Sequence, residues 1–426
     1  MARWLAGGMA VAGLWHAAPA LAQLVDAFFP PGIIGYNTDV GVTVATRARP
    51  DFDPLGIQLG SITVRPSFSE GLGYDSNPVL RPPSPGFATR TSPVVNSTLA
   101  VQVNSRWSKD NFSAYLSAND FRYPSASSQD TTNFTGSLGQ TINIGEDILT
   151  GAVSHVSQSQ TSRDLDTPPL DRAGVFTIDN VRLTYAANRG PFYFYPQLNY
   201  TAWRYDNVTS FGKPLNQTYR NRDIADASLL VKYGEALLRD FAAVLRGASI
   251  HYTNPEAGQP NRDATTFAAL VGIDNAASSV WRTRLLVGYQ ARQFTSPALR
   301  ATAAPIVEAN VTWSPSGLTT ITGSATRAIQ DAAAEFTQSY TYNEVQLSID
   351  HELLRNLLLR AYVDYQRADN QQGGGHETIE AAGASATWLM NRNMRLSGSY
   401  DYTTKHATSY GTLSESIVML RLMLGI

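Results

Sequence analysis

Histidine, serine and glutamate are the residue types in this chain whose spacing could support chemistry. His376 and Glu380 lie four residues apart, but the glutamate stands where an HExxH zinc motif has its second histidine. A three-ligand metal site built on these two residues is conceivable but weak. Ser249 and His251 would share one face of a strand, yet no third member of a triad is evident, and chance explains the pair better. We therefore predict no catalytic residue and no metal site.

Other chemistries also lack their residues in this sequence. The chain has no cysteine, which excludes thiolate zinc sites, cysteine nucleophiles, disulfides and a lipoprotein anchor. No nucleophile elbow, phosphate-binding P-loop or dinucleotide fingerprint occurs. A net charge of −2 over 426 residues argues against a strongly basic nucleic-acid binder. The sequence thus predicts no cofactor, no nucleic-acid partner and no enzymatic activity.

The N-terminus predicts export. Residues 1–22 combine Arg3, an apolar run and the small-residue cleavage site at Ala20-Leu21-Ala22, which is the pattern of a secretory signal peptide. No later stretch holds the roughly 18 apolar residues of a transmembrane helix. Residues 23–58 are interrupted by prolines, and we expect them to form an irregular periplasmic lead-in.

Residues 59–426 alternate between apolar and polar side chains with a period of two. In one segment Val345, Leu347 and Ile349 share a face, whereas Glu344 and Ser348 share the other. The segments are longer than the strands of ordinary globular proteins and suit tilted strands that cross a bilayer. Many apolar faces also end in an aromatic residue, as the interfacial girdles of outer-membrane barrels do. These residues are Trp107, Tyr185, Tyr233, Trp281, Trp313, Tyr365, Trp388 and Tyr400.

Short and long connections alternate along this region. About nine long polar stretches and eight short turns join the segments, which predicts about 18 strands, within a range of 16–18. In hydrocarbon every backbone polar group must be paired, so such a sheet must close on itself. We therefore predict an all-β fold, a closed antiparallel transmembrane β-barrel with short periplasmic turns and longer extracellular loops, in the outer membrane of a Gram-negative bacterium.

A barrel of this size is too wide to be filled by its own wall side chains, which predicts an aqueous lumen unless something plugs it. The candidate pore-lining residues are the charged ones of inward parity, which could tune selectivity or only stabilise a polar wall. They are Arg106, Arg182, Arg222, Arg246, Arg282, Arg284, Arg360, Arg395, Arg421, Asp226, Glu308, Glu344 and Asp364. The proline-containing stretches 76–92 and 161–174 could fold into the lumen, although we favour a surface position for both.

The start of the barrel region carries a family resemblance. Asp53, Pro54, Gly56, Ile57 and Gly60, followed by the strand ending Tyr74-Asp75-Ser76-Asn77, resemble the barrel entry of the second β-barrel porin family. Two later stretches match the turns of that family, Trp313-Ser314-Pro315 and His351-Glu352-Leu353-Leu354-Arg355-Asn356. The resemblance spans residues 47–426 and implies an outer-membrane pore, in a family that often accompanies exopolysaccharide or capsule genes in Gram-negative bacteria.

Three functions stay open on the sequence alone. The favoured one is a passive channel for small polar solutes, with a possible tie to exopolysaccharide export. The others are a structural or adhesive barrel with a plugged lumen, which plugging by residues 23–58 would support, and a lipid-modifying barrel enzyme. The expected partners are outer-membrane lipid, the barrel assembly machinery and polysaccharide export components. The oligomeric state stays open, although Ala382, Ala384 and Ala386 hint at a flat outward patch.

Overall fold

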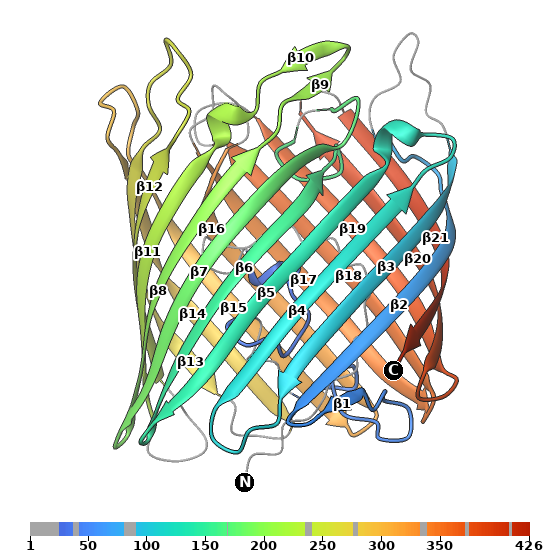
Figure 1. Ribbon diagram of the computed structural model, residues 1–426. Coiled ribbons are helices and arrows are strands. Elements are labelled where there is room, and N and C mark those ends of the chain that lie inside the picture. The colour runs from blue at the N-terminus through green and yellow to red at the C-terminus, as the bar shows by residue number, and fades with distance from the viewer. Residues whose placement is uncertain are drawn as a thin grey trace.

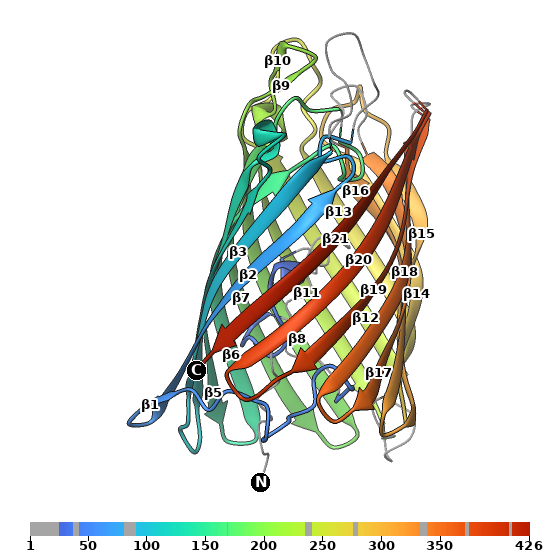
Figure 2. The same ribbon diagram turned by 90° about the vertical axis from the view of Figure 1, so that its right-hand side faces the viewer.

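The computed structural model describes residues 25–36, 42–80, 91–167, 169–234, 241–275, 280–332, 339–370, 375–408 and 411–426. Within these residues eighteen long antiparallel strands form one continuous sheet, and the last of them, β21, pairs with the first, β2, which closes the barrel. The strands run steeply tilted around a cylinder (Figures 1 and 2). The predicted fold class and strand number are confirmed.

The long strands hold 12 to 16 residues each. Their bounds are β2 (Ile62–Asp75), β3 (Ser92–Ser105), β4 (Asn111–Arg122), β5 (Thr131–Ile144), β6 (Asp147–Gln160), β7 (Gly174–Arg189), β8 (Phe192–Tyr205), β11 (Arg222–Tyr233), β12 (Phe241–Tyr252), β13 (Ala264–Asn275), β14 (Trp281–Phe294), β15 (Thr302–Ser316), β16 (Thr319–Asp331), β17 (Ser339–Leu354), β18 (Leu357–Asn370), β19 (His376–Leu389), β20 (Met394–Ala407) and β21 (Gly411–Gly425).

Several short elements accompany the long strands. Strand β1 (Ile57–Leu59) pairs with the start of β2, and β9 (Val208–Ser210) and β10 (Lys213–Leu215) form a small hairpin beyond β8. Three 3-10 turns are η1 (Asp26–Phe28), η2 (Ser127–Gln129) and η3 (Thr218–Arg220). Among the described residues no helix is long and apolar enough to cross a membrane.

The two ends of the barrel differ. Connections such as 145–146 and 190–191 are two residues long, whereas those between β4 and β5 and between β6 and β7 are much longer. We call these the short-turn end and the long-loop end. Strand β2 starts and the chain ends at the short-turn end, as an even strand number requires (Figure 1).

Alternation along each strand sorts side chains between the two faces. Leu72, Leu116 and Val418 are more than half exposed and face outward, where a membrane would cover them. Outward aromatic pairs lie at the short-turn end, where the rings of Trp281 and Trp313 stack with their centroids 5.2 Å apart. This placement matches the aromatic girdle expected at a membrane interface.

The largest cluster of buried apolar residues lies inside the barrel. It joins inward-facing residues of the wall, such as Tyr115, Val156 and Ile178, to residues from the N-terminal side of the chain. A dark blue segment is visible within the cylinder in both views (Figures 1 and 2). The described lumen is therefore occupied rather than empty.

Candidate functional site

The inner wall carries charged side chains in cross-strand clusters. Glu308 on β15 is paired with Arg246 on β12, whose Nη2 lies 3.1 Å from Glu308 Oε2, and with Arg284 on β14 at 3.8 Å. Asp274 accepts from Arg284 at 3.1 Å and from Lys232 at 2.8 Å. Opposite charges that meet across the strands of one face stabilise each other and keep the wall polar.

The predicted pore-lining residues, except Arg106, lie on barrel strands, on the face opposite the exposed apolar side chains. Arg106 is exposed in the turn after β3, where its Nη2 donates to Gly60 O at 2.6 Å. The others are distributed around the barrel rather than gathered in one ring. They have wall or lumen partners, such as Asp350 for Arg360, Asn96 for Arg421 and Asn199 for Asp226. Their lining of an open pore stays a prediction.

The first occupant of the lumen is residues 25–36, which we call the lumen segment. Asp26 Oδ1 accepts from Arg182 Nη1 at 2.6 Å, and the same nitrogen donates to Gly35 O at 2.8 Å. The Tyr36 hydroxyl donates to Asn180 Oδ1 at 2.9 Å. Part of the expected periplasmic lead-in therefore contacts the inner wall midway along β7.

Apolar packing fixes the lumen segment more extensively than its polar contacts do. Val25, Ile33 and Tyr36 have no exposed surface, and Phe29 is almost fully buried. The Phe29 ring stacks on Tyr36 at 4.5 Å between centroids and meets the edge of Tyr115 at 6.2 Å. Fully burying side chains of this size contributes about 1.5–3 kcal/mol each, so the segment is firmly seated.

Burial of the Asp26 carboxylate partly opposes the seating of the lumen segment. Burial raises the pKa of Asp26 above its ordinary value, while the positive charge of Arg182 acts to lower it. The carboxyl group therefore binds a proton more readily when the lumen segment is seated than when it is in water.

Residues 42–53 tie the chain to the short-turn end of the wall. Arg47 and Arg49 both contact Glu352 on β17, the second with a nitrogen–oxygen distance of 3.0 Å. Asp53 accepts from Arg395 on β20 at 3.0 Å. We call these contacts the anchor. The N-terminal part of the chain is thus held at two places. The lumen segment contacts the wall at the middle of the lumen, and the anchor contacts the wall at the short-turn end.

The second occupant is the loop 161–167 between β6 and β7. Its Arg163 lies between Glu415 on β21 and Asp75 on β2, with nitrogen–oxygen distances of 2.7 Å to each. Burial would lower the pKa of Arg163, but the carboxylates of Glu415 and Asp75 hold it well above its usual value. Leu165 packs into a buried cluster with wall residues such as Tyr342. The expectation that this stretch lies at the surface is wrong for residues 161–167. The ion pairs of Arg163 with Glu415 and Asp75 hold these residues inside the barrel, together with the burial of Leu165.

Lys405 on β20 completes the seat of this loop. Its ammonium donates to the carbonyl oxygens of Ser162, Asp164 and Thr167 at 3.1, 2.7 and 3.2 Å, and Glu377 lies 3.4 Å away. The Lys405 side chain has no exposed surface. An ammonium has three donor positions, so the three carbonyls satisfy it completely. Of the second stretch, 76–92, only residues 76–80 and 91–92 are described, and the fate of its centre lies outside the described residues.

An arginine and aromatic cluster lies toward the long-loop end. Arg292 and Arg222 contact Asp331 on β16 at 2.5 and 3.2 Å. The Arg222 guanidinium also lies 5.0 Å from the Trp203 ring, and that of Arg220 lies 4.0 Å from the Tyr205 ring. Stacked guanidinium groups keep their charge while being shielded from water. The functional candidates here are Arg220, Trp203 and Tyr205. Alternation along a strand predicts the face on which a side chain lies, but it did not predict that these residues meet.

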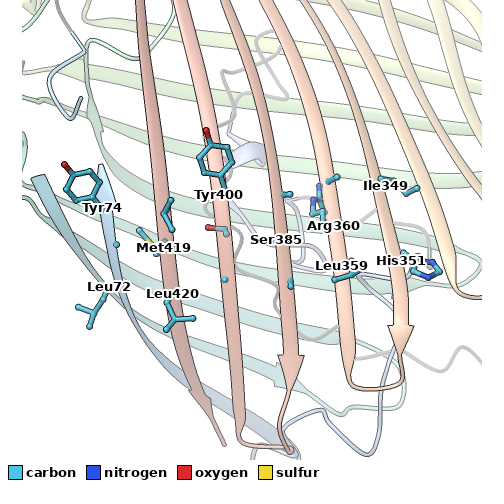
Figure 3. Close-up of a pocket in the computed structure, with 17 residues that line it drawn as sticks. Leu72, Tyr74, Ile349, His351, Leu359, Arg360, Ser385, Tyr400, Met419 and Leu420 are labelled. Carbon is cyan, nitrogen blue, oxygen red and sulfur yellow. The ribbon is translucent and has the colours of Figure 1, made fainter. Parts of the chain in front are cut away.

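A groove of about 850 Å³ lies on the outer surface near the barrel seam. Leu72 and Tyr74 of β2 form one side and Ile349 of β17 the other, with Ala384 and Ala386 among the residues between them (Figure 3). The small residues belong to the patch that the sequence suggested as flat. The groove faces away from the lumen, so it is not part of a passage.

Sequence reasoning named both of the described lumen occupants only as alternatives and favoured neither. The lead-in carries Phe28, Phe29 and Tyr36 together with Ile33 and Ile34, an apolar content that is unusual for a solvated linker. That composition was the available signal. No comparable signal marks residues 161–167, whose burial depends on charges from distant strands. Among the described residues, no group of three or more His, Asp or Glu side chains is placed to hold a metal ion.

Structural comparison finds solved bacterial proteins that this chain resembles at low sequence identity. A BenF-like porin from Pseudomonas fluorescens Pf-5 is 8% identical, covering 86% of this chain and 100% of the porin, with a TM-score of 0.47. OpdK of Pseudomonas aeruginosa, solved with vanillate, is 9% identical over 85% of this chain and 99% of its own, with a TM-score of 0.47. OccK2 (OpdF) of the same species, in complex with glucuronate, is 11% identical over 86% and 99%, with a TM-score of 0.46.

Sequence comparison gives the family. No curated protein matches the chain. The family model described as "Putative beta-barrel porin 2" matches residues 49–425, which is nearly the whole barrel together with the end of the lead-in. This is the family that the barrel-entry motif resembles. The chain is therefore a porin-like β-barrel and belongs to the β-barrel porin 2 family.

Proposed function

We propose that the protein is a passive outer-membrane channel for small polar solutes in a Gram-negative bacterium, and that its N-terminal segment normally occupies the lumen. The observation that carries this proposal is the closed barrel of 18 strands with a charged inner wall. A wall of this circumference encloses more space than its own side chains fill. The family and fold favour a channel over an enzyme.

The occupied lumen favours one second candidate, the structural or adhesive barrel with a permanently blocked interior. Both the lumen segment and loop 161–167 contact the wall with buried apolar and charged groups. The two candidates differ in whether these occupants can leave. A role beside exopolysaccharide export components is a refinement of the channel proposal, and it rests on the family resemblance.

Conductance across a planar lipid bilayer tests the proposal. We would compare the wild-type mature chain with a full-length variant that carries Asp26→Ala, Phe29→Ala and Tyr36→Ala, which we call the unseated variant, and with the same variant after addition of Arg163→Ala. Heat-modifiable gel migration would establish that each barrel is folded. A channel predicts steady current at least when both occupants are weakened, and block by soluble glycan fragments would support the export role. Three folded but silent proteins would refute the channel and leave the blocked barrel.

A further inference from the structure

We propose that the wall beneath the lumen segment is a binding site for small hydroxylated aromatic acids, and that the lumen segment occupies it as an internal stand-in for such a solute. The inference rests on the proposed channel function, since a solute reaches this wall only through the lumen. Its evidence is the chemistry of the groups that the segment now satisfies.

The first group is a buried cation. Arg182 on β7 is only 6% exposed, and its Nη1 donates to the Asp26 carboxylate at 2.6 Å and to Gly35 O at 2.8 Å. Both acceptors belong to the lumen segment. When the segment leaves, the guanidinium keeps Asn199 Oδ1 at 3.5 Å from its Nε but loses its carboxylate partner, and a carboxylate is the group that best replaces it.

The second group is a surface for a planar ring. Tyr115 is 5% exposed and meets the Phe29 ring edge-on, at 6.2 Å and an interplanar angle of 67°. The Tyr36 ring lies under the Arg182 guanidinium, 4.9 Å from it. Wall residues Val156 and Ile178 are fully buried in the same cluster. The site therefore offers an aromatic edge, a cation above a ring face and an apolar floor.

The third group is a fixed hydrogen-bond acceptor. Asn180 is 1% exposed, and its Oδ1 accepts from the Tyr36 hydroxyl at 2.9 Å. Its Nδ2 donates to Asn199 Oδ1 at 2.7 Å and to Thr201 Oγ1 at 2.8 Å, which fixes the amide with its oxygen toward the segment. Without the segment this oxygen needs a donor, and a phenolic hydroxyl supplies one.

These three groups together select one class of solute. A carboxylate for Arg182, a ring for Tyr115 and a hydroxyl for Asn180 are the features that Asp26, Phe29 and Tyr36 now supply. A small aliphatic acid lacks the ring, and a neutral phenol lacks the charge. The tethered segment has an effective concentration in the millimolar range, so a free solute competes well only after the segment is weakened.

Binding of 4-hydroxybenzoate to the full-length protein in detergent, followed by isothermal titration calorimetry, tests the inference. We expect the unseated variant to bind this probe at least about tenfold more tightly than the wild type, because its site is free. Adding Arg182→Met to the unseated variant should weaken binding by about tenfold or more. The matched control is Arg367→Met in the same background. It removes an arginine of β18 that pairs with Asp369, outside the contacts of the lumen segment, and should leave binding unchanged.

Acetate carries the charge without the ring, and phenol carries the ring without the charge. Each should bind more weakly than 4-hydroxybenzoate. The inference is overturned if the folded unseated variant binds 4-hydroxybenzoate no better than the wild type, or if Arg182→Met and Arg367→Met weaken binding equally. Gly35→Ala provides a second route if the triple substitution does not fold, because the new Cβ would lie 2.2 Å from the Ala152 Cβ. Current without probe binding would refute this site alone, whereas probe binding without current would refute the channel alone.

Discussion

Removing the charge of Arg163 should release loop 161–167 from the lumen. Arg163 is the cation between Asp75 and Glu415, whose side chains are 0% and 2% exposed. Breaking a buried ion pair by removing one partner costs about 3–5 kcal/mol, because a buried charge is left without compensation. A carboxylate can take up a proton instead, so we use the lower figure of about 3 kcal/mol for Arg163→Met.

The assay uses the absence of cysteine from the chain. Ser162→Cys places a single thiol at a position that is 3% exposed, and maleimide labels it only when the loop opens. About 3 kcal/mol corresponds to a factor of about 10² in the open population, so Arg163→Met should accelerate labelling by roughly that factor. Arg122→Met serves as the matched control, because Arg122 is half exposed in its pair with Asp120 and such pairs contribute at most about 1 kcal/mol.

A compensating variant tests the physical reason. Asp75→Asn and Glu415→Gln, added to Arg163→Met, remove the uncompensated charges and should bring the labelling rate back toward that of the wild type. Labelling of Arg163→Met at the rate of the Arg122→Met control would refute the reasoning, since the buried ion pairs would then contribute nothing to the seat of the loop.

Three further predictions concern the segment and the outer groove. Gly35→Ala should unseat the lumen segment and leave the barrel folded, because φ is +83° at this glycine and a Cβ would collide with Ala152. Unchanged bilayer current, together with unchanged 4-hydroxybenzoate binding, would contradict this prediction. Because seating raises the pKa of Asp26, the seated state is favoured at low pH and loses stability as the pH rises from about 4. The current of Arg163→Met, which keeps the lumen segment intact, should therefore rise over that range, and Asp26→Asn in the same background should remove this dependence. A current that falls instead would reverse the sign we derive. Ala384→Phe should fill part of the outer groove. If the protein is a monomer whose groove faces lipid, its stability should change little, as judged by the temperature of the heat-induced gel shift. A change of oligomeric state on native gels would instead identify the groove as a subunit interface.

The wall of this protein could be predicted from sequence because it depends on local rules. Strand period, turn residues and connection lengths each act within about 20 residues, and they gave the 18 strands and their inward parity. Arg182, Glu308 and Asp364 lie on the expected face for that reason. Parity says which way a side chain points, but it does not identify the partner that it meets.

The contents of the lumen could not be predicted in the same way, because their contacts join distant parts of the chain. Asp26 and Arg182 are 156 residues apart, and Arg163 and Glu415 are 252 apart. Such pairs form only after the barrel has brought their strands across the lumen from each other. The aromatic residues of the lead-in indicated that this stretch would be buried, but not where.

The anchor also orders the events of assembly. Arg49 pairs with Glu352, 303 residues later, and Asp53 pairs with Arg395, 342 residues later. Residues 42–53 are synthesised before their partners, because Glu352 and Arg395 lie on β17 and β20, late in the sequence. A nascent chain therefore carries an unanchored segment until the cylinder is nearly finished. The anchor is therefore a mark of late assembly, since it can form only in a barrel that already contains β17 and β20.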